Sequence, residues 1–187
     1  MQVEEILWVA HPAFSIDPHP DQRARSPEHT KAFFAKRLVP LAVKIARNPK
    51  AICVLQKTPS KVKTCSQSSL PLSAKTVQLQ EVLEQTEIEL ERQLRTIFGG
   101  KVVSVPNDAA YSVAEAASIV DAKLKARQWH TLSRTTIVGA GQYRKLCVKD
   151  FPSQFAFQKN VRFRESRKHT LPERLALKPL RQTMARP

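Results

Sequence analysis

Four short apolar runs, separated by stretches with helical spacing, constrain the fold of this chain more than any other feature. The runs are residues 6–9, 51–55, 102–105 and 136–139. Each is too short for a helix and is rich in β-branched residues. Runs of this kind that alternate with helices are typical of buried strands in a parallel sheet. We therefore predict a three-layer, Rossmann-like α/β domain with a mostly parallel sheet of four or five strands.

The first helix is predicted from an apolar face that follows Pro27. Members of this face recur every three or four residues, at Phe34, Leu38, Leu41 and Ile45. Pro40 lies within the pattern. Because proline has no N–H group, we expect Pro40 to kink or end the helix near Val39.

A longer helix is predicted within residues 77–100. Its apolar face comprises Leu79, Leu83, Leu90, Leu94 and Ile97, and Gly99-Gly100 should end it. We expect its five Glu residues on the solvent face. Two further helices are expected after the third and fourth strands. The last of them should contain Cys147 and end at Pro152.

The helix and strand patterns fade beyond Phe157, so we place the α/β domain at residues 1–157 and a basic, partly disordered tail at residues 158–187. The chain has a net charge of +15. Residues 159–187 hold nine Lys or Arg and two Glu, and residues 57–76 hold four Lys and no acid. A charge of this size favours contact with polyanions. A basic protein with a solvated tail is the alternative.

Several classes of protein are disfavoured by the sequence. No apolar run approaches the length of a membrane-spanning helix, and the start of the chain lacks the pattern of a secretory signal. The three cysteines form no CxxC pair and no zinc-binding spacing, which suits free thiols in a reducing cytoplasm. We expect no cofactor and no metal.

In a parallel sheet, the residues that follow the strands meet at one edge, where such folds bind ligands. These residues are the segment 11–21, Lys57, Asn107 with Asp108, and the segment 142–147. An acid, a lysine and a cysteine thus come from three loops. A thiolate at a helix start is stabilised by free N–H groups, a nearby carboxylate could act as base, and a lysine could support the developing charge.

Residues 141–148, Gly-Gln-Tyr-Arg-Lys-Leu-Cys-Val, resemble the signature of isochorismatase-like cysteine hydrolases. The resemblance spans residues 135–149. It implies an α/β fold with a parallel sheet, cleavage of amide or vinyl-ether bonds in small metabolites, and an oligomer in many members. It also implies that Cys147 is the nucleophile, Asp17 the base and Lys57 the supporting cation. Asn107, Gln142 and Tyr143 lie at the same predicted edge and are candidates for substrate contacts.

An interaction protein without catalysis is the competing hypothesis. Cys147 would then be a small buried apolar residue, the commonest fate of a free cysteine. The basic tail and residues 57–76 would bind nucleic acid or another anionic partner. The candidate contacts in the tail are Arg162, Arg164, Arg167, Lys168 and Arg174. Whether the protein is a homo-oligomer stays open.

Two other patterns are weaker. Residues 11–21 contain His11, Asp17, His19 and Asp21, which have the chemistry of metal ligands but not the spacing of a known site. Gly139-Ala140-Gly141 begins like a dinucleotide fingerprint. The third glycine of that motif is replaced by Arg144, however, and the preceding strand is the last of the four.

Overall fold

The computed structural model describes residues 1–12, 27–57, 74–105, 113–143 and 150–171. Its centre is a sheet in which every pair of neighbouring strands is parallel. The spatial order is β3-β2-β1-β4-β5. The strands are β1 (Gln2–Ala10), β2 (Ala51–Gln56), β3 (Val102–Val105), β4 (His130–Tyr143) and β5 (Arg162–Leu171). The predicted fold class is confirmed.

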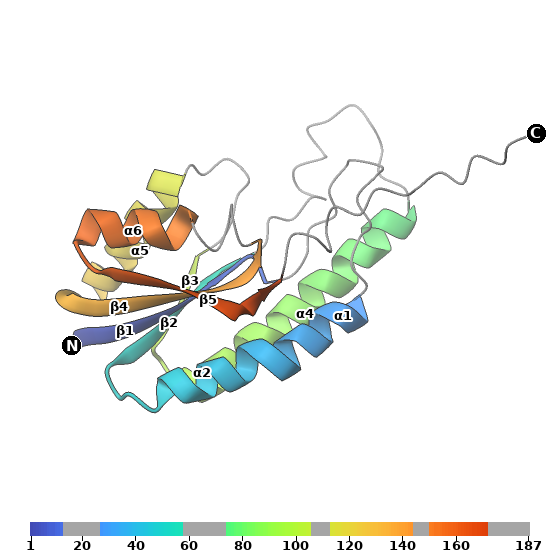
Figure 1. Ribbon diagram of the computed structural model, residues 1–187. Coiled ribbons are helices and arrows are strands. Elements are labelled where there is room, and N and C mark those ends of the chain that lie inside the picture. The colour runs from blue at the N-terminus through green and yellow to red at the C-terminus, as the bar shows by residue number, and fades with distance from the viewer. Residues whose placement is uncertain (13–26, 58–73, 106–112, 144–149, 172–187) are drawn as a thin grey trace, which may run out of the picture.

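Helices cover both faces of the sheet (Figure 1). One face packs against α1 (Pro27–Phe33), the π-helix η1 (Phe34–Leu38), α2 (Val39–Ala46) and α4 (Ala74–Phe98). The other face packs against α5 (Val113–Ala126) and α6 (Phe151–Lys159). The chain therefore builds β1, β2 and β3 outward on one side, and then returns to add β4 and β5 on the other side of β1.

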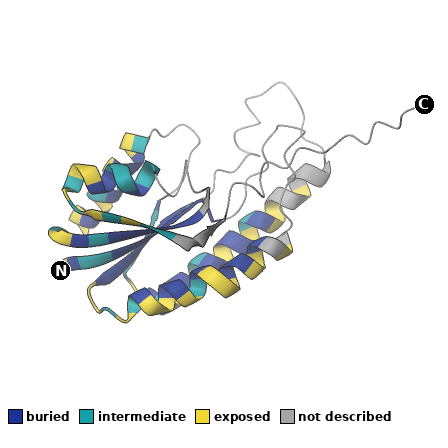
Figure 2. Cartoon of the chain, viewed as in Figure 1, coloured by how far each residue is buried: buried dark blue, intermediate teal, exposed yellow. Residues whose placement is uncertain are grey.

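Strand β1 is buried on both faces because it lies at the centre of the sheet (Figure 2). Successive side chains of a strand point to opposite faces. Leu7 accordingly packs in the cluster with α1, η1, α2 and α4, whereas Trp8 packs in the cluster with α5 and α6. The Trp8 ring lies 5.5 Å from that of Phe155. Burial on both faces explains why central strands are continuous apolar runs in the sequence.

Gly141 lets β4 lie close against β1 near their carboxyl ends. Its φ is +138°, and a Cβ built there would lie 2.1 Å from the carbonyl oxygen of Ala10. Every other residue type would need this backbone oxygen to move. The glycine thus serves sheet packing at the junction between the two halves of the fold.

The folded unit extends beyond the boundary predicted at residue 157. Residues 162–171, which lie within the predicted tail, form β5, which pairs with β4. The sequence pattern does not indicate this strand, because the strand lies at the edge of the sheet. Phe163 packs against the core, while Arg162 and Arg164 on either side of it are exposed.

The prediction for Pro152 is wrong, and of the two outcomes predicted for Pro40, a kink or an end, the helix does not end. Pro152 does not end the fourth predicted helix, because it lies in the first turn of α6, where its missing N–H costs no helical hydrogen bond. Pro40 does not end the first helix either. The backbone widens into the π-turn η1, in which the Val39 N–H donates to the carbonyl of Phe34, and the helix continues as α2.

The predicted long helix is confirmed as α4, which ends at Phe98 directly before Gly99 and Gly100. The expectation that all five of its Glu residues face solvent is wrong for Glu87 and Glu91. Glu87 is buried, and the side chain of Glu91 is only 14% exposed. Glu87 occupies the buried helical stripe between Leu83 and Leu90, four residues after one and three before the other.

No helix in the described part of the chain has both the length and the apolar character needed to cross a bilayer.

Candidate functional site at the carboxyl edge of the sheet

Three adjacent strands, β2, β1 and β4, end at the same edge of the sheet. The chain leaves β1 toward β2, on one side of β1, and later enters β4 on the other side of β1. The junction between β1 and β4 is therefore a topological switch point. Open α/β sheets bind ligands in the crevice beyond such a junction. Helices α1 and α4 extend past this edge (Figure 1).

The predicted site residues are only partly described by the structure. Lys57 directly follows β2 at this edge. Gln142 and Tyr143 end β4, although their side chains lie outside the described part. Asp17, Asn107 and Cys147 lie outside the described residues altogether.

Lys57 is held by a carboxylate of α4. Its Nζ lies 2.7 Å from Oε2 of Glu91, and its backbone N–H donates to the carbonyl of Val105 at 2.9 Å. The strand alternation explains the direction, because Leu55 and Lys57 both point toward the α4 layer. The Lys57 side chain remains 37% exposed. The lysine is therefore fixed in position while it still meets solvent.

Glu91 is itself anchored by two further donors. Ser104 donates to its Oε1 at 2.6 Å, and the Arg95 guanidinium donates to the same oxygen at 2.7 Å. Partial burial alone would raise the pKa of Glu91. The hydrogen bonds from Lys57, Ser104 and Arg95 outweigh burial and lower this pKa to about 2. The carboxylate stays charged across the physiological range, so its hold on Lys57 does not depend on pH there.

His11 lies at the switch point in an unusual conformation. Its φ is +45°, and its backbone N–H donates to the carbonyl of Gln56 at 2.9 Å. Strand alternation would direct its ring toward α4. The backbone of His11 is left-handed instead, and its ring makes an edge-on contact with the ring of Phe151 on the α6 side, with ring centroids 5.5 Å apart. Burial lowers the pKa of His11 to about 4, so the imidazole is neutral at pH 7.

Gln56 links β1 and β2 beneath this edge. It is buried, and its Oε1 accepts a hydrogen bond of 3.2 Å from Nε1 of the fully buried Trp8. The pair satisfies two polar groups that would otherwise be costly inside the core. It joins the neighbouring strands β1 and β2 by a polar contact inside the core.

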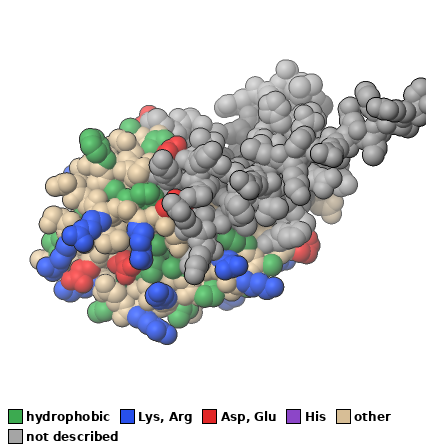
Figure 3. Space-filling model, in the orientation of Figure 1, with side chains coloured by type: hydrophobic (Ala, Val, Ile, Leu, Met, Phe, Trp, Pro, Cys, Tyr) green, Lys and Arg blue, Asp and Glu red, His purple; other side chains and the backbone are tan. Residues whose placement is uncertain are grey.

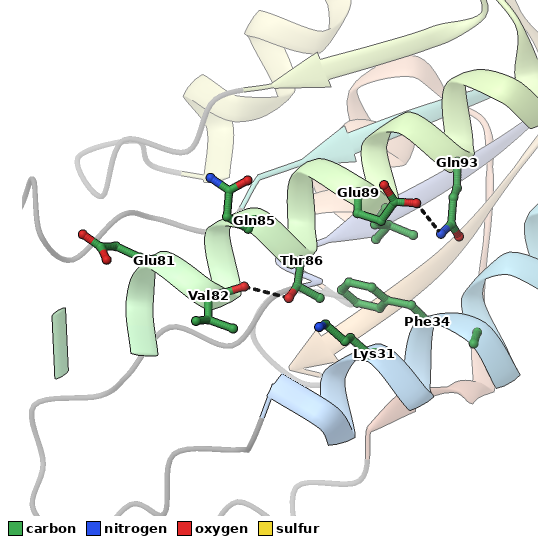
Figure 4. A pocket seen from close by; sticks show the side chains of 10 residues that line it. Lys31, Phe34, Glu81, Val82, Gln85, Thr86, Glu89 and Gln93 are labelled. Atoms are coloured by element: carbon green, nitrogen blue, oxygen red, sulfur yellow. Dashed lines mark hydrogen bonds between the residues drawn. The ribbon is translucent and has the colours of Figure 1, made fainter. Parts of the chain in front are cut away.

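A hollow lies between α1–η1 and α4 and has a volume of about 520 Å³ (Figure 4). Phe34 and Leu90 contribute apolar surface, while Lys31, Glu81 and Glu89 contribute charge. Glu89 already accepts hydrogen bonds from Arg92 and Gln93. The polar side chains therefore do not converge on one point, as they would in a catalytic site.

The predicted nucleic-acid contacts are also described in part. Arg162 and Arg164 are exposed on β5, the edge strand. The backbone of Arg167 and Lys168 belongs to β5, but their side chains lie outside the described part, and Arg174 lies beyond it.

Among the described residues, no group of three or more His, Cys, Asp or Glu side chains could hold a metal ion. Comparison with models of known protein families and with curated proteins found no match to this chain.

Sequence reasoning missed one residue of this edge, Glu91, and gave another, His11, no role in the site. The sequence predicts Glu91 on the solvent face because it is charged and lies outside the leucine stripe. Its spacing of four residues from Glu87 and from Arg95 was the available signal. His11 is expected at this edge, in the segment after the first strand, but the only role considered for it is in a metal cluster. Its position directly after a buried strand was the available signal, but nothing in the sequence indicates its positive φ.

Proposed function

We propose that this protein is a cysteine hydrolase that acts on a small metabolite at the carboxyl edge of its sheet. Cys147 is the nucleophile, Asp17 the base and Lys57 the supporting cation. The observation that carries the proposal is the parallel, adjacent arrangement of β1, β2 and β4, which directs the segments after all three strands to one edge. The local likeness of residues 135–149 to isochorismatase-like hydrolases supports the assignment of roles.

The proposed reaction on an amide has two balanced steps. Asp17 accepts the thiol proton of Cys147, and the thiolate attacks the carbonyl carbon. The C–N bond breaks as Asp17 returns the proton to the departing amine, which leaves a thioester on Cys147. Water then attacks the thioester, releases the carboxylic acid and restores the thiol.

Lys57 is suited to its role because its position does not depend on the substrate. The anchored carboxylate of Glu91 holds its ammonium, and the ammonium remains partly open to solvent. A fixed cation near a thiol lowers the thiol pKa and stabilises a developing oxyanion without rearrangement during the reaction.

Alkylation of the native protein tests the proposal. Iodoacetamide at pH 7, read out per cysteine by peptide mass spectrometry, should modify Cys147 faster than Cys65. Cys53 is an internal control, because it is fully buried and burial raises the pKa of its thiol. It should react only after unfolding.

The contribution of Lys57 is tested with a matched pair of variants. Lys57→Met should slow alkylation of Cys147 several-fold at pH 7. Lys101→Met removes the same charge beside the amino end of β3, at the opposite edge, and should leave the rate unchanged. The proposal fails if Cys147 is no more reactive than Cys65, or if both variants behave alike.

A further inference from the structure

A row of cations follows one face of the helical stretch from η1 to the residue after α2. Arg37, Lys44 and Arg47 are exposed and recur with Pro40 at spacings of three, four and three. Ala35 lines the hollow that faces α4. Because Arg37 lies two residues farther along, about half a turn around the helix, this row points away from α4.

Strand β5 presents a second row of cations. Phe163 packs toward α5 and α6, so Arg162 and Arg164 point to the opposite face of the sheet, where α1, η1 and α2 lie. Both arginines are exposed, and β5 contacts η1. Figure 3 shows Lys and Arg side chains along this side of the molecule. We call Arg37, Lys44, Arg47, Arg162 and Arg164 the basic face.

The cations of the basic face differ from most others on the protein. Most other described cations form ion pairs with neighbouring acids, as in Lys57–Glu91, Arg92–Glu89 and Lys125–Asp121, although some, such as Lys101 and Lys123, form none with a described acid. No member of the basic face has an ion pair with a described acid. Residues 27–50 contain six Lys or Arg and a single Glu. Most of the described cations without an ion pair to a described acid therefore lie in this stretch and on β5.

We propose that the basic face binds the phosphate backbone of a nucleic acid. The helical row spans ten residues, or about 15 Å, and duplex DNA carries about one charge per 1.7 Å of its axis, so several phosphates could be met at once. A protein partner would need an apolar centre in its interface. Among the described side chains of η1, α2 and β5, Val43 is the only large apolar one that is exposed.

This surface is distinct from the carboxyl edge, and the inference does not depend on the hydrolase proposal. The basic face is not a basic tail. Four of its five cations lie on helices and strands that pack in the sheet domain, and the fifth, Arg47, caps α2. Ordered elements hold the charges in fixed rows. These cations should therefore contact the phosphates of the nucleic acid, and the affinity should not depend on its base sequence.

The test measures binding of the full chain to a fluorescent oligonucleotide, as single strand and as duplex, over a range of salt concentrations. Two double variants remove the charges, Arg37→Gln with Lys44→Gln and Arg162→Gln with Arg164→Gln. Lys123→Gln with Lys125→Gln is the matched control, since it removes two exposed cations from α5 on the opposite face.

Each basic-face double variant should weaken binding about 10- to 30-fold near 0.15 M salt and lower the slope of log K against log salt by about 1.4 for single strands or 1.8 for duplex. The α5 control should bind like the unaltered protein. The inference is overturned if the control weakens binding equally, because net charge alone would then explain it. It is also overturned if neither oligonucleotide binds, or if only an acidic protein does.

Discussion

Replacing Glu91 with glutamine should destabilise the protein, because this carboxylate joins β2, β3 and α4 through Lys57, Ser104 and Arg95. A pKa lowered from 4.5 to about 2 corresponds to about 3 kcal/mol. Solvent screens part of this energy, since Lys57 is 37% and Arg95 48% exposed. We therefore expect Glu91→Gln to lower the free energy of unfolding by about 1–2 kcal/mol at pH 7.

The pH dependence follows from the direction of the shift. The pKa of Glu91 is lower in the folded protein than in the unfolded chain, so its contribution is complete above about pH 5 and disappears as the pH falls toward 2. Urea unfolding of both proteins at pH 7, 4 and 3 measures it. The difference between them should shrink steadily toward acid.

Glu89→Gln provides the matched control on the same helix. Hydrogen bonds from Arg92 and Gln93 also lower the pKa of Glu89 to about 2. Glu89 is 47% exposed, however, and its partner Arg92 is 74% exposed, so the loss in stability should be much smaller. Equal losses in the two variants, or a Glu91→Gln loss that is the same at every pH, would refute the reasoning.

Three other perturbations probe the core and the switch point. Gly141→Ala should lower the free energy of unfolding in urea by about 3 kcal/mol or more, because the added Cβ would collide with the backbone of β1. Gly100→Ala is the control and should be tolerated, because a Cβ there meets nothing within 4 Å. Trp8→Phe should cost about 1–3 kcal/mol by leaving Gln56 Oε1 buried without its donor, and an unchanged urea midpoint would contradict this. His11 should stay neutral down to about pH 4 in an NMR titration. Because its pKa is lower in the folded protein than in the unfolded chain, His11 should destabilise the protein as the pH falls from about 6.5 to 4. The variant His11→Gln should remove that part of the acid sensitivity.

The central strands were predictable because burial on both faces leaves no polar positions. The predicted run at residues 102–105 coincides with β3, and β2 extends the run at 51–55 by one residue to Gln56. The edge strand β5 was not predictable by the same rule, since one apolar residue, Phe163, anchors its described part to the core. An edge strand needs little apolar surface, and its arginines made it resemble a tail.

The candidate site was predictable only in its location. Parallel strands and the residues after them placed Lys57 at the carboxyl edge, and the structure has it there. Its ion pair with Glu91 depends on how α4 packs over β2, which single-sequence spacing does not specify. The direction of the His11 ring depends on one backbone dihedral that histidine rarely adopts.

Cross-linking of Lys57→Cys to Cys147 tests the central claim, that the segments after β2 and β4 meet at one edge, most directly. In a Cys65→Ser background, a short bismaleimide should join the two thiols in the native protein, and the buried Cys53 should stay unmodified. Lys101→Cys, beside the amino end of β3, is the control and should not cross-link to Cys147. Failure of the Lys57→Cys pair to join, or equal joining by the control, would contradict a shared site at this edge.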